Sequence, residues 1–381
     1  MQLKNITSIG IADIIGSGIT GVFWFYLATL LEPESYGEIH YIIAIAGIAS
    51  YICLVGTQNT LTVYVAKNIP IQSTLNFISL ILGILCFIIL SLFLDMTSGA
   101  LLVFGYIMSN LAIGLILGKR KYNVYMKYVL LQKFLTPVLG LGLYFTLGVE
   151  GVIYGLALTY IGYSFIIFKE FKITKIDFTL LRTRKKFILY NYLYMLTGPA
   201  HSHIDKIIIM PILGAAILGN YALTLQIISF MMIFSQVFYK YFLPQESAGY
   251  NIEKTKKMLI IISILMTIVG YFLVPLILPT VFPKYEESVE AIKIMSLSLI
   301  PMSIVTIYTS KFFALEKSKI VLIGLTISVG ILIPSMLILG RLYEINGVAA
   351  AFVIATVFQA GYFYYTNRKM NNMNKQNTDN L

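Results

Sequence analysis

About twelve apolar stretches, each long enough to cross a lipid bilayer, recur along this chain of 381 residues. A membrane helix needs about 20 mostly apolar residues, because the hydrocarbon core is about 30 Å thick and a helix rises about 1.5 Å per residue. Strands of a membrane barrel would be about ten residues long and would alternate in polarity, so they do not fit this pattern. The sequence therefore predicts an all-α, polytopic membrane protein with spans near 8–31, 38–61, 74–94, 97–118, 128–147, 150–168, 187–213, 216–242, 257–281, 287–313, 318–340 and 344–366.

The loops between these spans alternate in charge, and this alternation predicts the topology. Basic residues are retained on the cytoplasmic side during insertion. One set of loops carries the Lys119–Lys121 cluster, the basic run 169–186 and Lys317, whereas the other set is mainly acidic, with Glu32, Glu34, Asp95, Glu150, Glu286, Glu287 and Glu344. We therefore expect a multi-pass protein of the cell membrane with both termini in the cytoplasm.

The composition excludes a soluble globular domain. Hydrophobic residues make up 58% of the chain and charged residues only 12%, about half the charged content of an ordinary soluble domain. The net charge of +11 follows from the basic loops and suits an anionic inner leaflet, so no nucleic-acid partner is predicted. The two cysteines, Cys53 and Cys86, have no ligand-like spacing, and we expect no disulfide, metal or cofactor.

The spans divide into two sets of six, which suggests a duplicated architecture. We predict an N-terminal six-helix lobe at 1–168, a basic cytoplasmic linker at 169–186, a C-terminal six-helix lobe at 187–366 and a polar cytoplasmic tail at 367–381. The last span of each half opens on a similar motif, Gly151-Val152-Ile153 in the first and Gly347-Val348-Ala349 in the second. Halves with an even number of helices point the same way, a geometry that leaves a central cavity between the lobes.

Polar and ionisable residues inside the predicted spans are the candidate functional residues. A charge near the bilayer centre costs about 2.5–3.5 kcal/mol on insertion scales, so it usually faces the protein interior or a watery cavity. Span 187–213 carries a stripe at steps of three and four, which lies on one helix face. Its members are Asn191, Tyr194, Gly198, His201 and Asp205.

From such stripes we predict a hydrophilic lumen that binds substrate. Its candidate substrate-binding residues are Lys133, Lys206, Lys293, Asn191, His201, Gln226 and Gln236. The lysines would attract an anionic headgroup such as a pyrophosphate. Asp13 and Asp205 are candidates for coupling to H+ or Na+, because a carboxylate removed from water takes up a proton more readily. The alternative, that small and hydroxyl residues only let helices pack closely, stays open, especially for Gly21 and the serines.

Three segments resemble the polysaccharide and oligosaccharide flippase family of the multidrug/oligosaccharidyl-lipid/polysaccharide exporter superfamily. The stretch Leu30–Gly37 resembles the Leu-Gly-Pro-Glu-x-Tyr-Gly turn of that family, with Glu32 in place of the usual glycine. The stretch from His203 through Gly214 to Pro244 resembles its Asp, Leu-Gly and Gly-x-Tyr pattern. The stretch from Phe282 to Ala351 resembles its last four helices, although many relatives have fourteen helices in total.

The resemblance implies a flippase that moves a lipid-linked oligosaccharide or polysaccharide precursor from the cytoplasmic to the outer leaflet by alternating access. Its partners would be the lipid-linked glycan, membrane lipids and glycan-assembly enzymes. A second interpretation keeps the fold but makes the cargo an amphipathic cation or drug, which predicts an acidic cavity. A membrane enzyme acting on lipid-linked sugar is less favoured, because no carboxylate cluster with metal-like spacing occurs.

Overall fold

The computed structural model describes the backbone of residues 2–55 and 57–379. It describes side chains at 15–55, 57–186, 188–189, 191–193, 195–196, 203–243 and 245–372. Within these ranges every regular element is a helix, so the predicted all-α fold class is confirmed. The chain forms two compact units, and each is described by itself.

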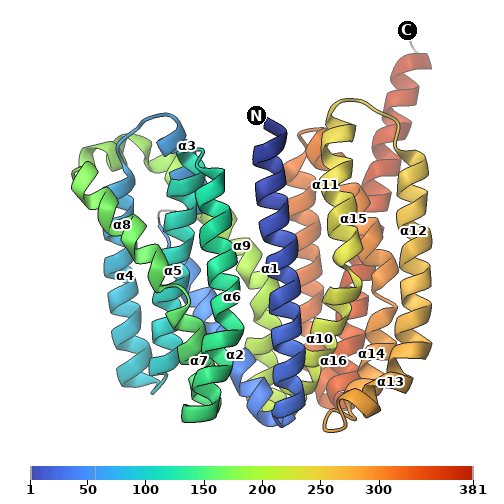
Figure 1. Cartoon of the computed structure of the whole chain (residues 1–381). Helices are drawn as coiled ribbons and strands as arrows, with labels where there is room; N and C mark the ends of the chain where they lie inside the picture. The colour runs from blue at the N-terminus through green and yellow to red at the C-terminus, as the bar shows by residue number, and fades with distance from the viewer. Residues whose placement is uncertain (1, 56, 380–381) are drawn as a thin grey trace. The chain divides into compact units, whose positions relative to one another are not determined.

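Unit 1 comprises the chain up to Leu30 together with Glu38–Ile207. Within it, α6 packs against both α1 and α7, and α5 packs against α3, α4, α7 and α8 (Figure 1). Its helices are α1 (Gln2–Leu30), most of α2 (Pro33–Cys53), α3 (Gln58–Ala66), α4 (Gln72–Phe93), α5 (Thr97–Gly118), α6 (Tyr122–Leu147), α7 (Val149–Leu158), α8 (Ile161–Ile173) and most of α9 (Phe178–Leu213).

Unit 2 comprises Leu31–Gly37 together with the chain from Ile208 onward. Here α15 packs against α11, α12 and α16, and α14 packs against α10 and α16 (Figure 1). Its helices are α10 (Ala215–Met231), α11 (Ile233–Ser247), α12 (Glu253–Ile268), the π-helical η1 (Val269–Leu273), α13 (Val274–Val281), α14 (Ser288–Ser296), α15 (Leu299–Ala314) and α16 (Ser318–Asp379).

Seven helical segments of the described chain are long and apolar enough to cross a membrane, or up to nine if each of two bent pairs is one span. The segment Ile15–Leu30 is a shorter apolar helix, and α16 contains two helices joined at a kink where Glu344 has a φ of 50°. That kink lies at the loop predicted between the last two spans. With α9 counted as well, these segments correspond to the twelve stretches of the sequence, and the number that crosses the bilayer stays a prediction.

The bend between α14 and α15 and the π-helical segment each lie close to a proline. The pair α14 and α15 bends by 43°. Pro301 lies near the start of α15, and proline has no N–H to donate to the carbonyl of Leu297 four residues earlier. The η1 segment likewise precedes Pro275, and π-helical turns are common where the regular hydrogen-bond ladder is interrupted. A methyl group on Gly270 would lie 2.2 Å from Ser296 Oγ, so the Ser296 side chain of α14 packs directly on the backbone of η1.

The basic run 169–186 is mostly helical, because α8 continues to Ile173 and α9 starts at Phe178. The turn between these two helices is bound to the start of α4. Thr74 Oγ1 accepts a hydrogen bond from the Asp177 N–H at 2.8 Å and donates one to the Asp177 carbonyl at 3.2 Å. Ser73 donates to the Glu170 carbonyl at 3.2 Å. The lobe boundaries predicted from the loops stay a prediction; the compact units divide the chain within α9, at Ile207.

The short segment Leu31–Gly37 makes very close backbone contacts with α10 in unit 2. A methyl group on Gly37 would lie 2.0 Å from the Ala215 carbonyl oxygen, and one on Gly219 would lie 1.8 Å from the Pro33 carbonyl oxygen. Only glycine permits so close an approach at both positions. Two of the segments that carry the family resemblance therefore pack directly against each other.

The third such segment reaches the same place through Lys284 and Tyr285. The Tyr285 hydroxyl donates to the Leu31 carbonyl at 3.4 Å, and the rings of Tyr36 and Tyr285 meet edge to face at 5.9 Å. Lys284 Nζ lies 2.9 Å from Glu32 Oε1. The glutamate that departs from the family pattern is thus paired with a lysine of the third segment.

Candidate functional site

An ion pair between neighbouring residues marks the second half of α9. Lys206 Nζ lies 3.1 Å from Oδ1 and 3.2 Å from Oδ2 of Asp205, and the Lys206 N–H donates to Oδ1 at 2.8 Å. The Asp205 side chain is only 7% exposed and that of Lys206 13%. Removing two charges from solvent is costly, so such a pair inside an apolar helical unit is a functional candidate.

Two histidines that the sequence analysis did not select surround this pair. Lys206 is close enough to His40 and His203 to interact with both through its charge. Asp205 interacts with His203 in the same way. His203 lies between the stripe positions on α9, so the steps of three and four passed over it, and His40 lies near the edge of a predicted span. The available signal was rarity, since the chain has three histidines.

Neighbouring side chains hold both imidazoles in place. The His40 ring packs on Trp24, with ring centroids 4.8 Å apart. His203 lies against α2 so closely that a methyl group on Gly47 would be 2.7 Å from its Nε2. Its Nδ1 is buried and makes no hydrogen bond to any residue that the structure describes. A buried imidazole nitrogen of this kind is able to bind a small polar group that donates a hydrogen bond.

Of the other predicted residues of unit 1, Lys133 and Asn191 have described side chains. Lys133 on α6 packs its aliphatic stem on α1, where a methyl group on Gly16 would be 3.0 Å from its Cγ. Asn191 is partly buried in the first half of α9, next to Tyr192, whose hydroxyl donates to the Ile52 carbonyl at 2.8 Å. The side chains of Asp13 and His201 lie outside the described residues.

Unit 2 contains a pocket of about 450 Å³ between α10, α11 and α15; several hydrogen-bonding side chains line it, although most of its exposed lining surface is apolar. Gln236, a predicted substrate-binding residue, lines it together with Lys240 one turn later. Of the described residues that line this pocket, none is acidic, and most can donate or accept hydrogen bonds. They are Ser229, Met232, Ser235, Gln236, Tyr239, Lys240, Met302, Val305, Thr306 and Thr309.

The structure does not bring Gln226 and Lys293 to the lining of this pocket. Gln226 is partly buried on α10. Lys293 on α14 forms an ion pair with Glu290 at 2.5 Å, with side chains 31% and 60% exposed. An exposed pair three residues apart on a helix contributes about 0.5 kcal/mol or less. The assignment of these residues to a lumen stays a prediction.

A second buried carboxylate lies where α11, α12 and α15 meet. Glu246 accepts a hydrogen bond from Ser310 Oγ at 2.6 Å, and its other oxygen lies 2.8 Å from Lys256 Nζ. Glu246 is 9% exposed and Lys256 13%, so this pair is part of the interior of unit 2. Among the residues described, no group of three or more His, Cys, Asp or Glu side chains is arranged to hold a metal ion.

Comparisons with solved structures show which known proteins have a similar fold. One structure, the inward-facing conformation of a multidrug resistance MATE family transporter of the MOP superfamily, is similar over 97% of this chain and 99% of its own, with a TM-score of 0.74 and 16% identity. The lipid II flippase MurJ in an inward closed conformation is similar over 94% of this chain and 87% of its own, with a TM-score of 0.75 and 16% identity.

A third structure is a variant of the Vibrio cholerae MATE transporter VcmN, with a TM-score of 0.54, 14% identity, and coverage of 96% of this chain and 93% of its own. No protein-family model and no curated protein matches the sequence. The likeness therefore concerns the fold. This chain has the multi-pass helical membrane fold found in MOP-superfamily transporters.

Proposed function

We propose that this protein is a membrane flippase that moves a lipid-linked oligosaccharide or polysaccharide precursor between leaflets by alternating access. The pocket of unit 2, which is lined by Lys240 and by hydroxyl and amide side chains, is the observation that carries this proposal. Its lysine and its hydroxyl and amide groups suit a pyrophosphate with attached sugars, because Lys pairs with multiply charged phosphate groups and sugar hydroxyls need both donors and acceptors. The lipid II flippase among the structures with this fold supports the same substrate class.

The second candidate function is export of drugs or organic cations, and the MATE structures with this fold support it. An organic cation is stabilised by carboxylates, and the lining of the unit 2 pocket offers Lys240 and no acidic side chain among the residues described. The electrostatics of this pocket therefore favour an anionic headgroup. We place the working protein in the cell membrane, with its termini in the cytoplasm and glycan-assembly enzymes as partners.

For ion coupling, we propose that Asp205 binds the coupling H+ or Na+ together with the two histidines beside it. Lys206 pairs with the Asp205 carboxylate and lies near both imidazoles, so a bound cation would compete with Lys206 for this carboxylate. Asp205→Asn removes the carboxylate and is expected to abolish the dependence of transport on an imposed pH or sodium gradient. Transport that keeps its full gradient dependence in this variant would remove Asp205 from the coupling role.

The substrate proposal is tested with purified protein in liposomes. A fluorescent polyprenyl-pyrophosphate-linked sugar in both leaflets is quenched from outside, and the fraction that becomes accessible over time measures flipping. We expect the protein to accelerate flipping of this lipid and to leave ethidium release from the same liposomes unchanged. Accelerated ethidium release without lipid flipping would replace the flippase with the cation exporter.

A further inference from the structure

A separate pocket of about 600 Å³ lies in unit 1, between the turn that joins α3 to α4 and the turn that joins α5 to α6. It is bordered by the ends of α3 and α5 and by the start of α4, and all three belong to candidate membrane spans. The pocket therefore lies at the level where spans end and loops begin. Phospholipid headgroups occupy this level of a bilayer.

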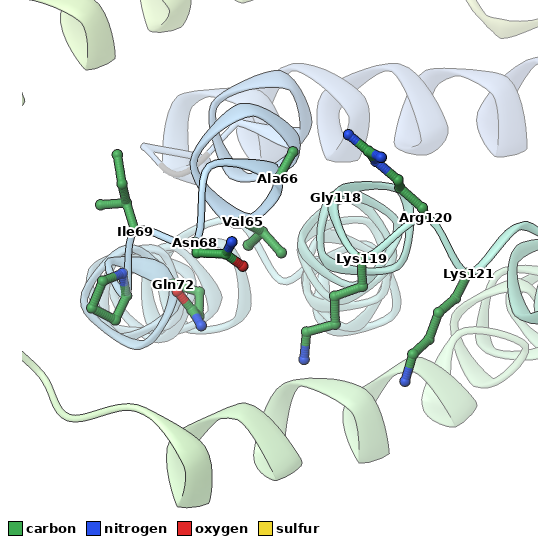
Figure 2. Close-up of a pocket in the computed structure, with 10 residues that line it drawn as sticks. Val65, Ala66, Asn68, Ile69, Gln72, Gly118, Lys119, Arg120 and Lys121 are labelled. Atoms are coloured by element: carbon green, nitrogen blue, oxygen red, sulfur yellow. The ribbon is translucent and has the colours of Figure 1, made fainter.

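The lining is basic and polar. Lys119, Arg120 and Lys121 border it in succession, facing Asn68 and Gln72 at the turn between α3 and α4. In Figure 2, Lys119 extends from the end of α5 on the same side as the carboxamides of Asn68 and Gln72, whereas Arg120 points away from these carboxamides. Lys119 is also paired with the buried carboxylate of Glu170, so Lys121 supplies the uncompensated positive charge at the lining, and Arg120 adds to the positive potential of this surface.

The side chain of Gln72 indicates that the pocket accommodates a polar ligand. It is only 8% exposed, and its amide oxygen is buried without a hydrogen-bond partner among the described residues. Leaving such a group unsatisfied costs about 1–3 kcal/mol. A ligand hydroxyl that donates a hydrogen bond to this oxygen would remove that cost.

The start of α4 adds a further attraction for an anion. Its N-cap residue, Ile71, makes no side-chain capping bond, and the N-terminus of a long helix carries a partial positive charge. The C-terminal ends of α3 and α5, which have the opposite polarity, are followed by Lys67 and Lys119. The basic residues thus offset the two negative helix ends and leave the pocket favourable for a phosphate.

We propose that this pocket binds the headgroup of an anionic phospholipid of the surrounding leaflet, with the phosphate near Lys121 and a headgroup hydroxyl at Gln72. Basic pockets between membrane helices are known to select such lipids. A phosphatidylglycerol headgroup has both the charge and the hydroxyl that the pocket calls for, whereas phosphatidylcholine has neither. The site does not depend on which substrate the protein transports.

The test is a lipid titration of the full-length protein in neutral detergent, followed by native mass spectrometry. We expect retention of phosphatidylglycerol over phosphatidylcholine. Arg120→Asn combined with Lys121→Gln should lower the affinity for phosphatidylglycerol about 30-fold, from about fivefold for each basic side chain near the membrane surface. Asparagine is chosen because Arg120 has a φ of 56°, a conformation that asparagine tolerates.

Lys185→Gln combined with Lys186→Gln is the matched control, because both residues are exposed at the start of α9 and lie outside this pocket. It removes the same charge and should change the affinity less than threefold. Gln72→Glu keeps the size of the side chain but adds a negative charge, and it should weaken phosphatidylglycerol binding at least tenfold. An equal loss in the control pair, or no loss in Gln72→Glu, would overturn the proposal.

A thermal unfolding series separates the two sources of phosphate. Dihexanoyl-phosphatidylglycerol should raise the unfolding midpoint of the wild-type protein, and dihexanoyl-phosphatidylcholine should not. Potassium phosphate at the same concentration and ionic strength should also have no effect. Equal protection by inorganic phosphate would show that the pocket takes a soluble anion, and the lipid assignment would then be wrong.

Discussion

His40 and His203 are the residues through which the ion pair on α9 meets α2. They are held by packing as much as by charge, since Gly47 leaves no room for even a methyl group beside His203. The periodicity of one helix identified Asp205 as a candidate. It could not identify His40, because the pattern along one helix does not say which residue of another helix lies opposite.

Replacing Gly47 by alanine tests this packing. The new methyl group would lie 2.7 Å from His203 Nε2, and overpacking of this kind costs about 1–3 kcal/mol. We expect a lower thermal unfolding midpoint in detergent. Gly361→Ala is the control, because nothing lies within 4 Å of a methyl group there and alanine has the higher helix propensity. Equal midpoints for the two variants would show that α2 and His203 are not in contact.

The Asp205 and Lys206 pair is expected to behave as a coupled unit in a double-mutant cycle. Asp205→Asn alone leaves the Lys206 charge poorly compensated and should cost about 3 kcal/mol, and adding Lys206→Gln should recover part of that loss. Unfolding free energies in mixed detergents measure both. The exposed Glu290 and Lys293 pair is the control, with an expected coupling of about 0.5 kcal/mol. Additive effects at Asp205 and Lys206 would contradict the pairing.

At the scale of elements, apolar length predicted which segments are helical, but it could not predict where helices break within a span. The predicted spans 216–242 and 287–313 are each a bent pair of helices. The break before α15 has a sequence signal in Pro301. The break between α10 and α11 at Met232 has no proline, and its 45° bend depends on packing that a linear pattern does not contain.

The turn between α8 and α9 also depends on long-range contacts, because it is bound by α4. Thr74→Val keeps the shape of the side chain and removes both hydrogen bonds to the backbone of Asp177, each worth about 1 kcal/mol. We expect trypsin to cleave after Lys172 and Lys175 about 30 times faster, because cleavage requires local opening and about 2 kcal/mol corresponds to a factor of about 30. Thr183→Val, which affects only bonds within its own helix, to the Leu180 carbonyl and from the Arg184 guanidinium, should leave the rate unchanged. An unchanged rate in Thr74→Val would show that this turn is held by other contacts.

At the scale of the whole molecule, hydropathy and loop charge were sufficient for the fold class, because the bilayer imposes helix length and satisfied backbone groups on any such chain. The candidate site was predicted only in part. Asp205 lies in a buried ion pair and Gln236 lines the unit 2 pocket, and the assignment of both residues to a lumen stays a prediction. Lys293 belongs to an exposed ion pair with Glu290. The stripe on its helix did not reveal this partner.

The predicted topology is tested with single cysteines in a background without Cys53 and Cys86. A cysteine at Glu286 should react with a membrane-impermeant maleimide in intact cells, because this acidic loop is assigned to the outside. A cysteine at Lys319 should react only after the cells are permeabilised. Both positions are exposed, so access to the reagent depends on the side of the membrane. Labelling of Lys319→Cys in intact cells would reverse the orientation.

The most direct test of the proposed function is the flipping rate of a polyprenyl-pyrophosphate-linked sugar in liposomes that contain the wild-type protein, Lys240→Gln or Lys254→Gln. Lys240 lines the unit 2 pocket, and a charge-assisted contact to phosphate is worth about 1.5–3 kcal/mol. Lys240→Gln should therefore slow flipping about tenfold or more, whereas Lys254→Gln, at an exposed position of α12, should match the wild-type rate. A wild-type rate no faster than that of protein-free liposomes, or equal rates for Lys240→Gln and the wild type, would contradict the account.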